Sequence, residues 1–511
     1  MAKVKIQGNA SGSGVITLIA PNTDTDRTIT LPDESITLSA GATSLDGLSD
    51  AAITASNNIG LGSGAVDSIT TGDNNTGVGV NALTANTEGS SNVAMGRESL
   101  DANTTGYENT GIGYQALTSN TTAFHNTAVG NKALQSNTTG ATNTAVGWEA
   151  AKTSTTAENV AAFGYQAAQD NTASNITAIG TNALMENTSG ANGVAVGHNA
   201  LKTNTTGSAN TALGRQALKA NTTANHNTAG GFESMLSNTT GTGNTVFGSE
   251  SLRLNTTGNY NIGLGAESLK SNTTGSNNVA IGGTALQNNT TSNIIGIGHE
   301  AGKANTSGGL NVFIGYQAGL ANTTQQRNVH IGYTAGRACT GSYNTSVGTF
   351  AGDGLINGDH NVAIGHNAQS SSTGANGCFT MGDGNISNLR CQDTSISSLS
   401  DSRDKKNIVD VPLGLSFINT VRPVAFEWDA RADDGGELRG ELNVALANKK
   451  SFGFIAQELK TAADATDYAD YMRLVHTDNP SRLEADPMKM FPILVKAIQE
   501  LSAKVTALES K

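Results

Sequence analysis

Residues 126–142 read NTAVGNKALQSNTTGAT, and this pattern recurs with little change from about residue 55 to residue 365. One glycine anchors each copy. Nineteen such glycines run from Gly62 to Gly365 in steps of 17 residues, with a step of 16 at three places. A fixed period of this length is typical of units that cannot bury their apolar residues alone and stack on their neighbours. The sequence therefore predicts a mostly β fold with an elongated β-solenoid or β-roll shaft.

Two apolar positions keep their phase through the repeat. The residue before each anchor is nearly always apolar, as in Val78, Met95 and Ile112, and a leucine follows four residues after the anchor, as in Leu83 and Leu100. We expect both side chains to point inward. A disordered low-complexity tract is the less favoured alternative, because disorder does not preserve apolar phase over such a length.

The Asn-Thr-Thr-Gly segments predict turns, because Asn and Gly tolerate positive φ and Thr suits strands. Stacked asparagine side chains are expected to bond from repeat to repeat as ladders. One local alternative stays open: residues 215–220 fit either a single helical turn or a strand. Near the end of the repeat, glycine replaces the leucine at Gly302, Gly319, Gly336 and Gly352.

Composition agrees with a thin, repetitive structure. The chain has 511 residues, of which 61 are Gly, only 7 are Pro and 14% are charged, and its net charge is −12. No basic patch supports nucleic-acid binding. Of the 72 charged residues (30 basic and 42 acidic), 33 lie in the last 112, which marks a domain boundary near residue 400.

Four domains are predicted on these grounds. Residues 1–45 form short strands, 46–369 the repeat shaft, 370–399 a short-strand neck, and 400–511 a small α+β domain. That last domain has an ordinary apolar core that includes Phe417, Ile418, Val421, Val424, Phe426 and Trp428.

Two further segments of the last domain have readable patterns. Residues 452–459 read as a strand passing into a helix. In the predicted C-terminal helix 487–511, apolar residues follow the spacing of a short coiled coil: Leu494, Ile498, Leu501, Val505 and Leu508. Taken alone, β-branched residues alternating with Leu favour two strands, but two heptads are too few to decide the number of chains.

The charged domain opens with Leu399-Ser400-Asp401-Ser402-Arg403-Asp404-Lys405. In an arbitrary protein such a cluster is a solvated turn or a helix cap. Here the pattern S-D-x-R-x-K, followed by residues 422–428, 453–459 and 494–501, resembles the intramolecular chaperone of phage endosialidases and tail spikes, the peptidase S74 family. The resemblance covers about residues 395–511.

The resemblance implies that this domain trimerises, helps the upstream fibre to fold, and then cleaves the chain between Leu399 and Ser400. It assigns Ser400 as the nucleophile and Lys405 as the general base, with Asp401 and Arg403 in supporting roles of orientation and assembly. Serine needs a base to take its proton, and lysine serves as one only where burial or a nearby cation lowers its pKa. The implied activity is that of a single-turnover serine autoprotease without an external substrate.

No cofactor or metal is predicted. The histidines are scattered, and three copies of His330 around a metal on a three-fold axis are less favoured than a solvated position for that residue. The acids Glu98, Glu108 and Glu149 are expected at solvated turns, which leaves no carboxylate pair for cutting a sugar chain. Of the three cysteines, Cys378 and Cys391 fit a disulfide but are more typical of core thiols, as is Cys339.

Together these features predict a homotrimeric virion fibre of the tail-fibre type, made in the host cytoplasm. Residues 1–45 would attach it to a virion protein, since they resemble the openings of marine phage structural proteins. The opposite end would bind a host cell-surface receptor, a glycan or an outer-membrane component. We expect neither a signal peptide nor membrane insertion. The alternatives are a glycan-depolymerising tail spike and a bacterial trimeric adhesin, whose head repeats the shaft resembles.

Overall fold

The computed structural model describes residues 51–53, 57–370, 372–383, 386, 401–427, 450–477 and 483–511. The strands predicted in residues 1–45 lie outside these ranges.

The shaft is one stack of short strands, each three or four residues long. We call each strand with the turns that follow it a rung. The strands are β1 (Ala51–Ile53), β2 (Ile59–Leu61), β3 (Thr76–Val78), β4 (Val93–Met95), β5 (Thr110–Ile112), β6 (Thr127–Val129), β7 (Thr144–Val146), β8 (Val160–Phe163), β9 (Ile176–Ile179), β10 (Val194–Val196), β11 (Thr211–Leu213), β12 (Thr228–Gly230), β13 (Thr245–Phe247), β14 (Ile262–Leu264), β15 (Val279–Ile281), β16 (Ile295–Ile297), β17 (Val312–Ile314), β18 (Val329–Ile331), β19 (Thr345–Val347), β20 (Val362–Ile364) and β21 (Phe379–Met381).

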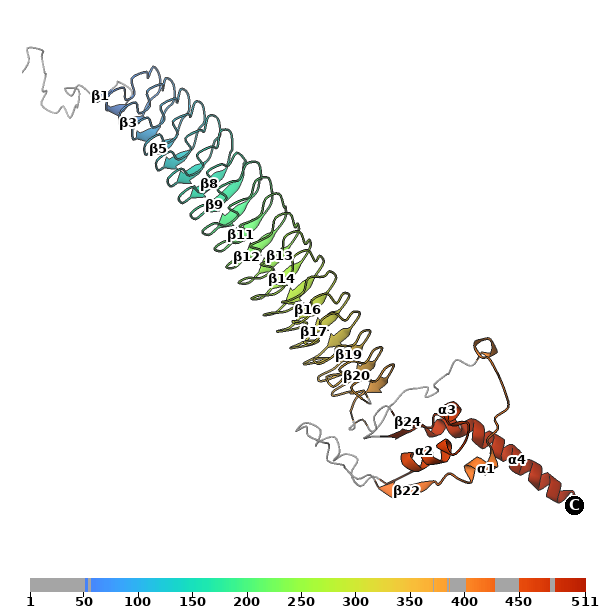
Figure 1. Cartoon of the computed structure of the whole chain (residues 1–511). Coiled ribbons are helices and arrows are strands. Elements are labelled where there is room, and N and C mark those ends of the chain that lie inside the picture. The colour runs from blue at the N-terminus through green and yellow to red at the C-terminus, as the bar shows by residue number, and fades with distance from the viewer. Residues whose placement is uncertain are drawn as a thin grey trace, which may run out of the picture.

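From β2 to β21 each strand pairs in parallel with the strand of the next repeat (Figure 1). Val129 of β6 lies opposite Val146 of β7, for example. The predicted β-solenoid with repeats of about 17 residues is confirmed, and its successive rungs come from one chain. The stack continues to Met381, so its last rung lies within the segment expected as a neck.

The strands turn a different side chain inward from the one predicted. In the strands from β2 to β20 the middle residue of the paired triplet is buried, such as Ala94 or Ala128, whereas the residue before the anchor glycine points outward; Met95 is 44% exposed. The prediction that this residue points inward was wrong. The coil leaves little room beside the strand, so Ala or Gly holds the middle position in most strands. The leucine four residues after the anchor is fully buried, as predicted, for instance at Leu134.

The turns depend on left-handed backbone. The anchor Gly130 has a φ of 138°, and a Cβ there would lie 2.3 Å from the carbonyl oxygen of Gly147 in the next rung. Non-glycine residues take positive φ in the same turns, among them Gln216 and Leu218 at 61° and 50°. Residues 215–220 therefore form neither a helical turn nor a strand, but a sharp turn that delivers Leu218 to the core.

Two asparagine ladders run through the interior, as predicted. In the first, which we call the strand ladder, the Oδ1 of Asn75 accepts from the backbone N–H of Asn92 at 2.9 Å, and the Nδ2 of Asn75 donates to the Gly89 carbonyl at 2.8 Å. In the turn ladder, the Nδ2 of Asn120 donates to the Oδ1 of Asn103 at 2.8 Å. These side chains are completely buried, so the neighbouring rung satisfies groups that water does not reach.

The glycines that replace leucine make room for large residues on the strands. A Cβ on Gly319 would lie 2.2 Å from the ring of Phe313, and one on Gly336 would lie 2.3 Å from the ring of His330. Both rings are fully buried and stack with centroids 5.8 Å apart. Burial lowers the pKa of His330 to about 4. The solvated position expected for His330 was wrong, and its place inside one chain also removes the three-copy metal site.

One predicted solvated acid is buried instead. The carboxylate of Glu149 accepts from Lys152 Nζ at 2.8 Å and from Gln169 Nε2 at 3.0 Å, and the residue is only 6% exposed. Burial opposes its ionisation, but the hydrogen bonds from Lys152 and Gln166 outweigh that effect and lower its pKa. Glu108 is exposed beside His125, as expected for a solvated turn. Cys339 is a buried thiol, whereas Cys378 is partly exposed and Cys391 lies outside the described residues.

The C-terminal part is a small mixed fold. Its elements are the 3₁₀ turn η1 (Ser402–Asp404), α1 (Leu415–Ile418), β22 (Val424–Glu427), β23 (Lys450–Gly453), α2 (Ala456–Asp464), α3 (Ala469–Met472), β24 (Val475–His476), β25 (Glu484–Ala485), the 3₁₀ turn η3 (Pro487–Met490) and α4 (Phe491–Glu509). The strand passing into a helix at residues 452–459 is confirmed by β23 and α2. β22 pairs with β23, and β24 pairs with β25, both in antiparallel fashion.

We predict that Asn120→Ala destabilises the shaft by about 1–3 kcal/mol, because it leaves the buried Oδ1 of Asn103 without its donor. The measurement is the midpoint of urea unfolding. Asn131→Ala is the matched control: this exposed asparagine lies in the neighbouring repeat and outside both ladders, so its change should stay within about 0.5 kcal/mol. Equal midpoints for the two variants would show that the turn ladder does not stabilise the stack.

Candidate functional site

The segment that opens the charged domain folds into a short capped turn. The carboxylate of Asp401 accepts from the backbone N–H of Arg403 at 2.9 Å and so caps η1. At the other end, the backbone N–H of Lys405 donates to the Ser402 carbonyl at 3.2 Å. Aspartate suits this position because its side-chain oxygen takes an N–H that the helix leaves without an acceptor.

Asp401 and Arg403 also form an ion pair. The Arg403 Nε donates to both carboxylate oxygens at 3.1 Å, and a terminal guanidinium nitrogen donates to Oδ2 at 2.6 Å. The side-chain hydrogen bond from Arg403 lowers the pKa of Asp401, and Asp401 raises the pKa of Arg403 in return. The pair therefore fixes the shape of η1 and neutralises the charge of Arg403.

Lys405 is exposed in the single chain. A lysine that acts as a general base needs low-polarity surroundings or an unpaired cation nearby. Lys405 lacks low-polarity surroundings among the described residues of one chain, since it is exposed. The guanidinium of Arg403 is paired with Asp401 and so is not an unpaired cation. Leu399 and Ser400, the predicted cleavage site, lie outside the described residues, so the predicted Ser400–Lys405 pair stays a prediction.

Behind this segment the domain has a compact core. Phe417 of α1, Leu459 of α2 and Met472 of α3 are buried together with Leu474, Met490 and Ile493. Ile418 and Val421, predicted as core residues, pack against this cluster, while Val424 and Phe426 are half-buried on β22. Trp428 lies outside the described residues. The core fixes α1, α2 and the start of α4 against one another.

A long-range contact joins α1 to α4. The Oε2 of Glu500 on α4 accepts from the backbone N–H of Leu415 at 2.9 Å, at the start of α1. A carboxylate is favourable there, because the first N–H groups of a helix carry partial positive charge. Glu500 was not among the predicted site residues, because 85 positions separate the two partners and no local pattern signals the contact.

A second ion pair holds α2. The guanidinium of Arg422, just before β22, donates to the carboxylate of Glu458 with its Nε at 2.9 Å and with a terminal nitrogen. The hydrogen bond from Arg422 lowers the pKa of Glu458. Both residues belong to the segments on which the family resemblance rests, and here they tie the strand to the helix.

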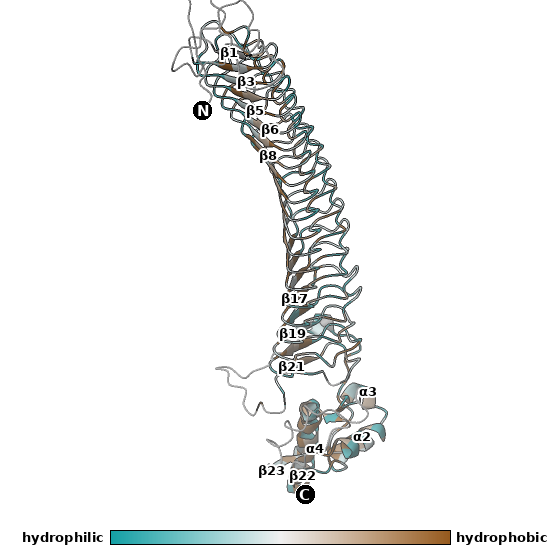
Figure 2. Cartoon of the chain, turned by 90° about the vertical axis from the view of Figure 1, so that its left-hand side faces the viewer, coloured by the Kyte–Doolittle hydropathy of each residue, from teal (hydrophilic) through white to brown (hydrophobic). Residues whose placement is uncertain are grey.

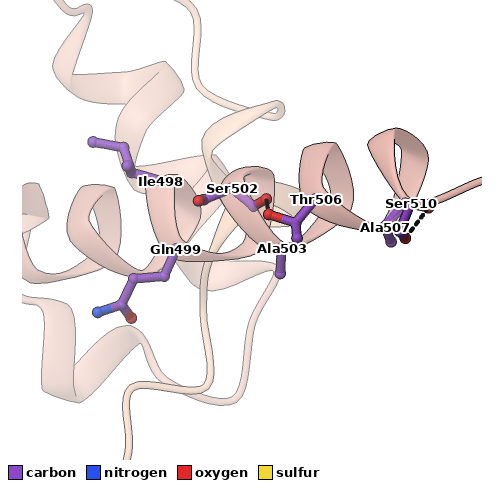
Figure 3. A pocket seen from close by; sticks show the side chains of 7 residues that line it. All are labelled: Ile498, Gln499, Ser502, Ala503, Thr506, Ala507 and Ser510. Carbon is purple, nitrogen blue, oxygen red and sulfur yellow. Dashed lines mark hydrogen bonds between the residues drawn. The ribbon is translucent and has the colours of Figure 1, made fainter.

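Helix α4 carries an uncovered apolar stripe along most of its length. Its exposed fractions are 39% for Leu494, 67% for Ile498, 50% for Leu501, 44% for Val505 and 70% for Leu508. The predicted helix is thus present as η3 and α4, and its coiled-coil residues face outward. Figure 3 shows the adjoining surface, where small side chains such as Ala503 and Thr506 leave a shallow groove. Thr506 donates to the Ser502 carbonyl of its own helix at 3.1 Å.

Two absences concern only the part of the chain that the structure describes. No group of three or more His, Cys, Asp or Glu side chains in this part of the chain is arranged to hold a metal ion. Among the helices described, none has both the length and the apolar character needed to cross a membrane.

Comparison with known proteins identifies the C-terminal part. Residues 400–468 match the model of the peptidase S74 family, the chaperone of endosialidase. This domain behind a β-solenoid shaft fits a tail fibre or tail spike with a C-terminal chaperone, and the family implies a phage tail protein associated with the virion. The searches of curated proteins and of solved structures found no match.

We predict that Glu500→Ala loosens α1 and destabilises the domain by about 1 kcal/mol, because α1 loses its carboxylate cap. Glu509→Ala removes the same charge from the exposed end of α4 and serves as the control. Limited proteolysis of the full-length chain, followed by mass spectrometry, should show faster cutting near residues 411–420 in the first variant only. Identical digestion patterns would contradict a structural role for Glu500.

Proposed function

We propose that the chain is a trimeric virion fibre that attaches to the host surface, and that its last domain assembles it and then cleaves itself off between Leu399 and Ser400. One observation carries this proposal: the match to the chaperone family begins at residue 400, the residue predicted to follow the cleaved bond. The shaft would be the lasting product, and residues 400–511 a folding aid.

The cleavage follows from the chemistry of serine beside a peptide bond. The Oγ of Ser400 attacks the carbonyl carbon of Leu399 while Lys405 takes the hydroxyl proton. The C–N bond breaks, the amine of Ser400 takes up a proton, and an ester joins the Leu399 carbonyl to the Ser400 oxygen. Water then hydrolyses this ester, leaving a carboxylate on Leu399 and restoring the hydroxyl of Ser400.

Assembly would switch this reaction on. Lys405 is exposed in one chain, and so are the apolar residues Ile408 and Val409 that follow it, at 69% and 73%. Packing of three domains through these residues and the α4 stripe would remove water from the segment. Desolvation favours the neutral form of a lysine, which is the form that accepts a proton. Cleavage would therefore report that three chains have assembled.

The shaft explains the need for such a domain. Its rungs are nearly identical, so three shafts can meet one repeat out of register with most side chains still in phase. Parallel strands also fold slowly, because they pair only after a whole turn of chain has closed. A domain that gathers three chains at one end sets the register for every rung. Removing it afterwards would leave the shaft kinetically trapped.

The remaining parts of the proposal concern attachment. Residues 1–45 would join the fibre to a virion protein, and the end near residue 399 would meet a glycan or an outer-membrane component of the host. Among the described residues, several shaft acids are already paired with other side chains, which does not favour the depolymerase alternative. Glu300 accepts from Lys303 at 2.7 Å and from Gln317 at 2.8 Å, and Arg253 donates to Glu233 at 2.8 Å. The adhesin alternative likewise gains no support from the described residues.

We predict that Ser400→Ala and Lys405→Met each leave a single full-length band of about 52 kDa on a denaturing gel, where the parent chain gives two fragments. Each variant removes one partner of the proposed proton transfer but leaves the apolar surfaces intact, so both should still form trimers. Ser402→Ala, two residues further on, is the matched control and should cleave like the parent. Two fragments from Ser400→Ala would refute the mechanism.

A further inference from the structure

The outward side of the shaft's parallel sheet is free of charge from end to end. Each of the twenty strands from β2 to β21 points two residues outward, at the first and third positions of the paired triplet. We call these positions together the sheet face. None of them holds Asp, Glu, Lys, Arg or His. The first position is mostly Thr, Val or Ile, and the third is Val, Ile, Leu, Met or Phe in every strand but one.

The exception supports the pattern. Gly230 holds the third position in β12, and the ring of Phe247 from the next rung lies over it, where a Cβ would be 2.4 Å from the ring. Elsewhere large apolar side chains stand open to solvent: Met95, Phe163, Ile179, Leu213, Phe247, Ile281, Ile364 and Met381 are between 36% and 46% exposed. Figure 2 shows the strands aligned along one side of the shaft, with hydrophobic colouring on them.

The turns of the same rungs behave differently. Two residues after the anchor, the chain places Glu98, Glu233 and Glu250, which are partly exposed and form ion pairs or hydrogen bonds with side chains of other turns. The turns of the shaft therefore tolerate charged residues. The sheet face of the same repeats has no charged residue, and this difference between two sides of one repeat needs its own explanation.

The sheet face is large enough for a stable interface. Twenty strands spaced about 4.8 Å apart give a strip roughly 90 Å long, and a three-residue strand is about 10 Å wide. The area is then on the order of 900 Å², compared with about 800 Å² per partner in a typical stable complex. The third position supplies an almost unbroken row of large apolar side chains along this strip, and monomeric proteins rarely expose large contiguous apolar patches.

We infer that the sheet face is the surface through which shafts of this chain pack together, parallel and in register, around a common axis. A partner must match the strand spacing over twenty rungs, and a second copy of the chain has that spacing by construction. Symmetry also accounts for the missing charges. Identical residues meet near the axis, so one lysine in the sequence would bring several like charges together at each such rung.

This inference rests on the proposed trimer and deepens it, because it assigns the shaft itself to the interface alongside α4. It also gives a role to the outward residue before each anchor, which does not pack inside its own coil: this residue would form the contact between shafts. The side chain is free to vary from Val to Phe, since packing around an axis adapts to size more easily than the narrow core does.

The test compares two cysteines in one rung. Ile179→Cys lies on the sheet face, and Thr181→Cys lies two residues later on an exposed turn. Both are made in the full-length chain with Cys378 and Cys391 changed to Ser, while the buried Cys339 is kept. A maleimide reagent should modify Ile179→Cys at least about tenfold more slowly than Thr181→Cys, because access controls thiol reactivity. Sedimentation of the same samples gives the mass of the assembly.

Each outcome decides the matter. Slow labelling at position 179 together with the mass of a trimer supports the inference. Equal labelling rates in a trimer would overturn it, while the proposed trimer through the C-terminal domain would stand. The mass of a single chain would overturn both, whatever the labelling rates. Because residue 179 points outward, circular dichroism of both variants should match that of the parent, which excludes misfolding as the cause.

Discussion

Most rungs of the shaft depend on a neighbouring rung to satisfy their buried asparagines. The Oδ1 of Asn92 accepts from the backbone N–H of Asn109, its Nδ2 donates to the Gly106 carbonyl, and the side chain is completely buried. A buried amide without partners costs more than one hydrogen bond contributes, so a rung on its own is unstable. The anchor glycines enforce the same contact from the backbone side, since a Cβ at Gly130 would strike Gly147. The shaft is therefore stable as a stack and marginal as a fragment, which makes the order of assembly matter.

The two sides of the strands differ in the size of their side chains and in what they pack against. The inward side is almost uniformly small, and where Phe313 or His330 intrudes, a glycine on the turn gives way. The outward side is uncharged along its whole length and mostly apolar. Such surfaces make a fibre durable once three chains are aligned but hazardous before then, because exposed apolar strips and strand edges invite aggregation. A C-terminal domain with its own core and an uncovered helical stripe would reduce that risk, because it would bring the three chains together before their shafts pack.

Much of this architecture was predictable from the sequence. The period, the turns, the asparagine ladders and the buried leucines follow from residues that recur in phase. The direction of the strand side chains could not be predicted from polarity, because neighbours such as Ala145 and Val146 are both apolar. Side-chain size was the useful signal, since the middle residue of the strand is mostly small. The burial of His330 depends on Gly336, six residues away, because the absence of a Cβ there makes room for the ring. This contact forms only when the coil closes, so the sequence alone did not reveal it. Within the candidate site, the motif identified Asp401 and Arg403, but their pairing and the Glu500 contact depend on folding.

The account is tested most directly by shortening the shaft. Deleting residues 97–197 joins Gly96 to His198 and removes six whole repeats, so every retained rung still finds a neighbour in phase. If each repeat is one rung of a parallel stack, the rod seen by electron microscopy should shorten by roughly 29 Å, about 4.8 Å per repeat. An unchanged length, or a loss of 100 Å or more as for extended chain at about 3.3 Å per residue, would contradict stacked rungs.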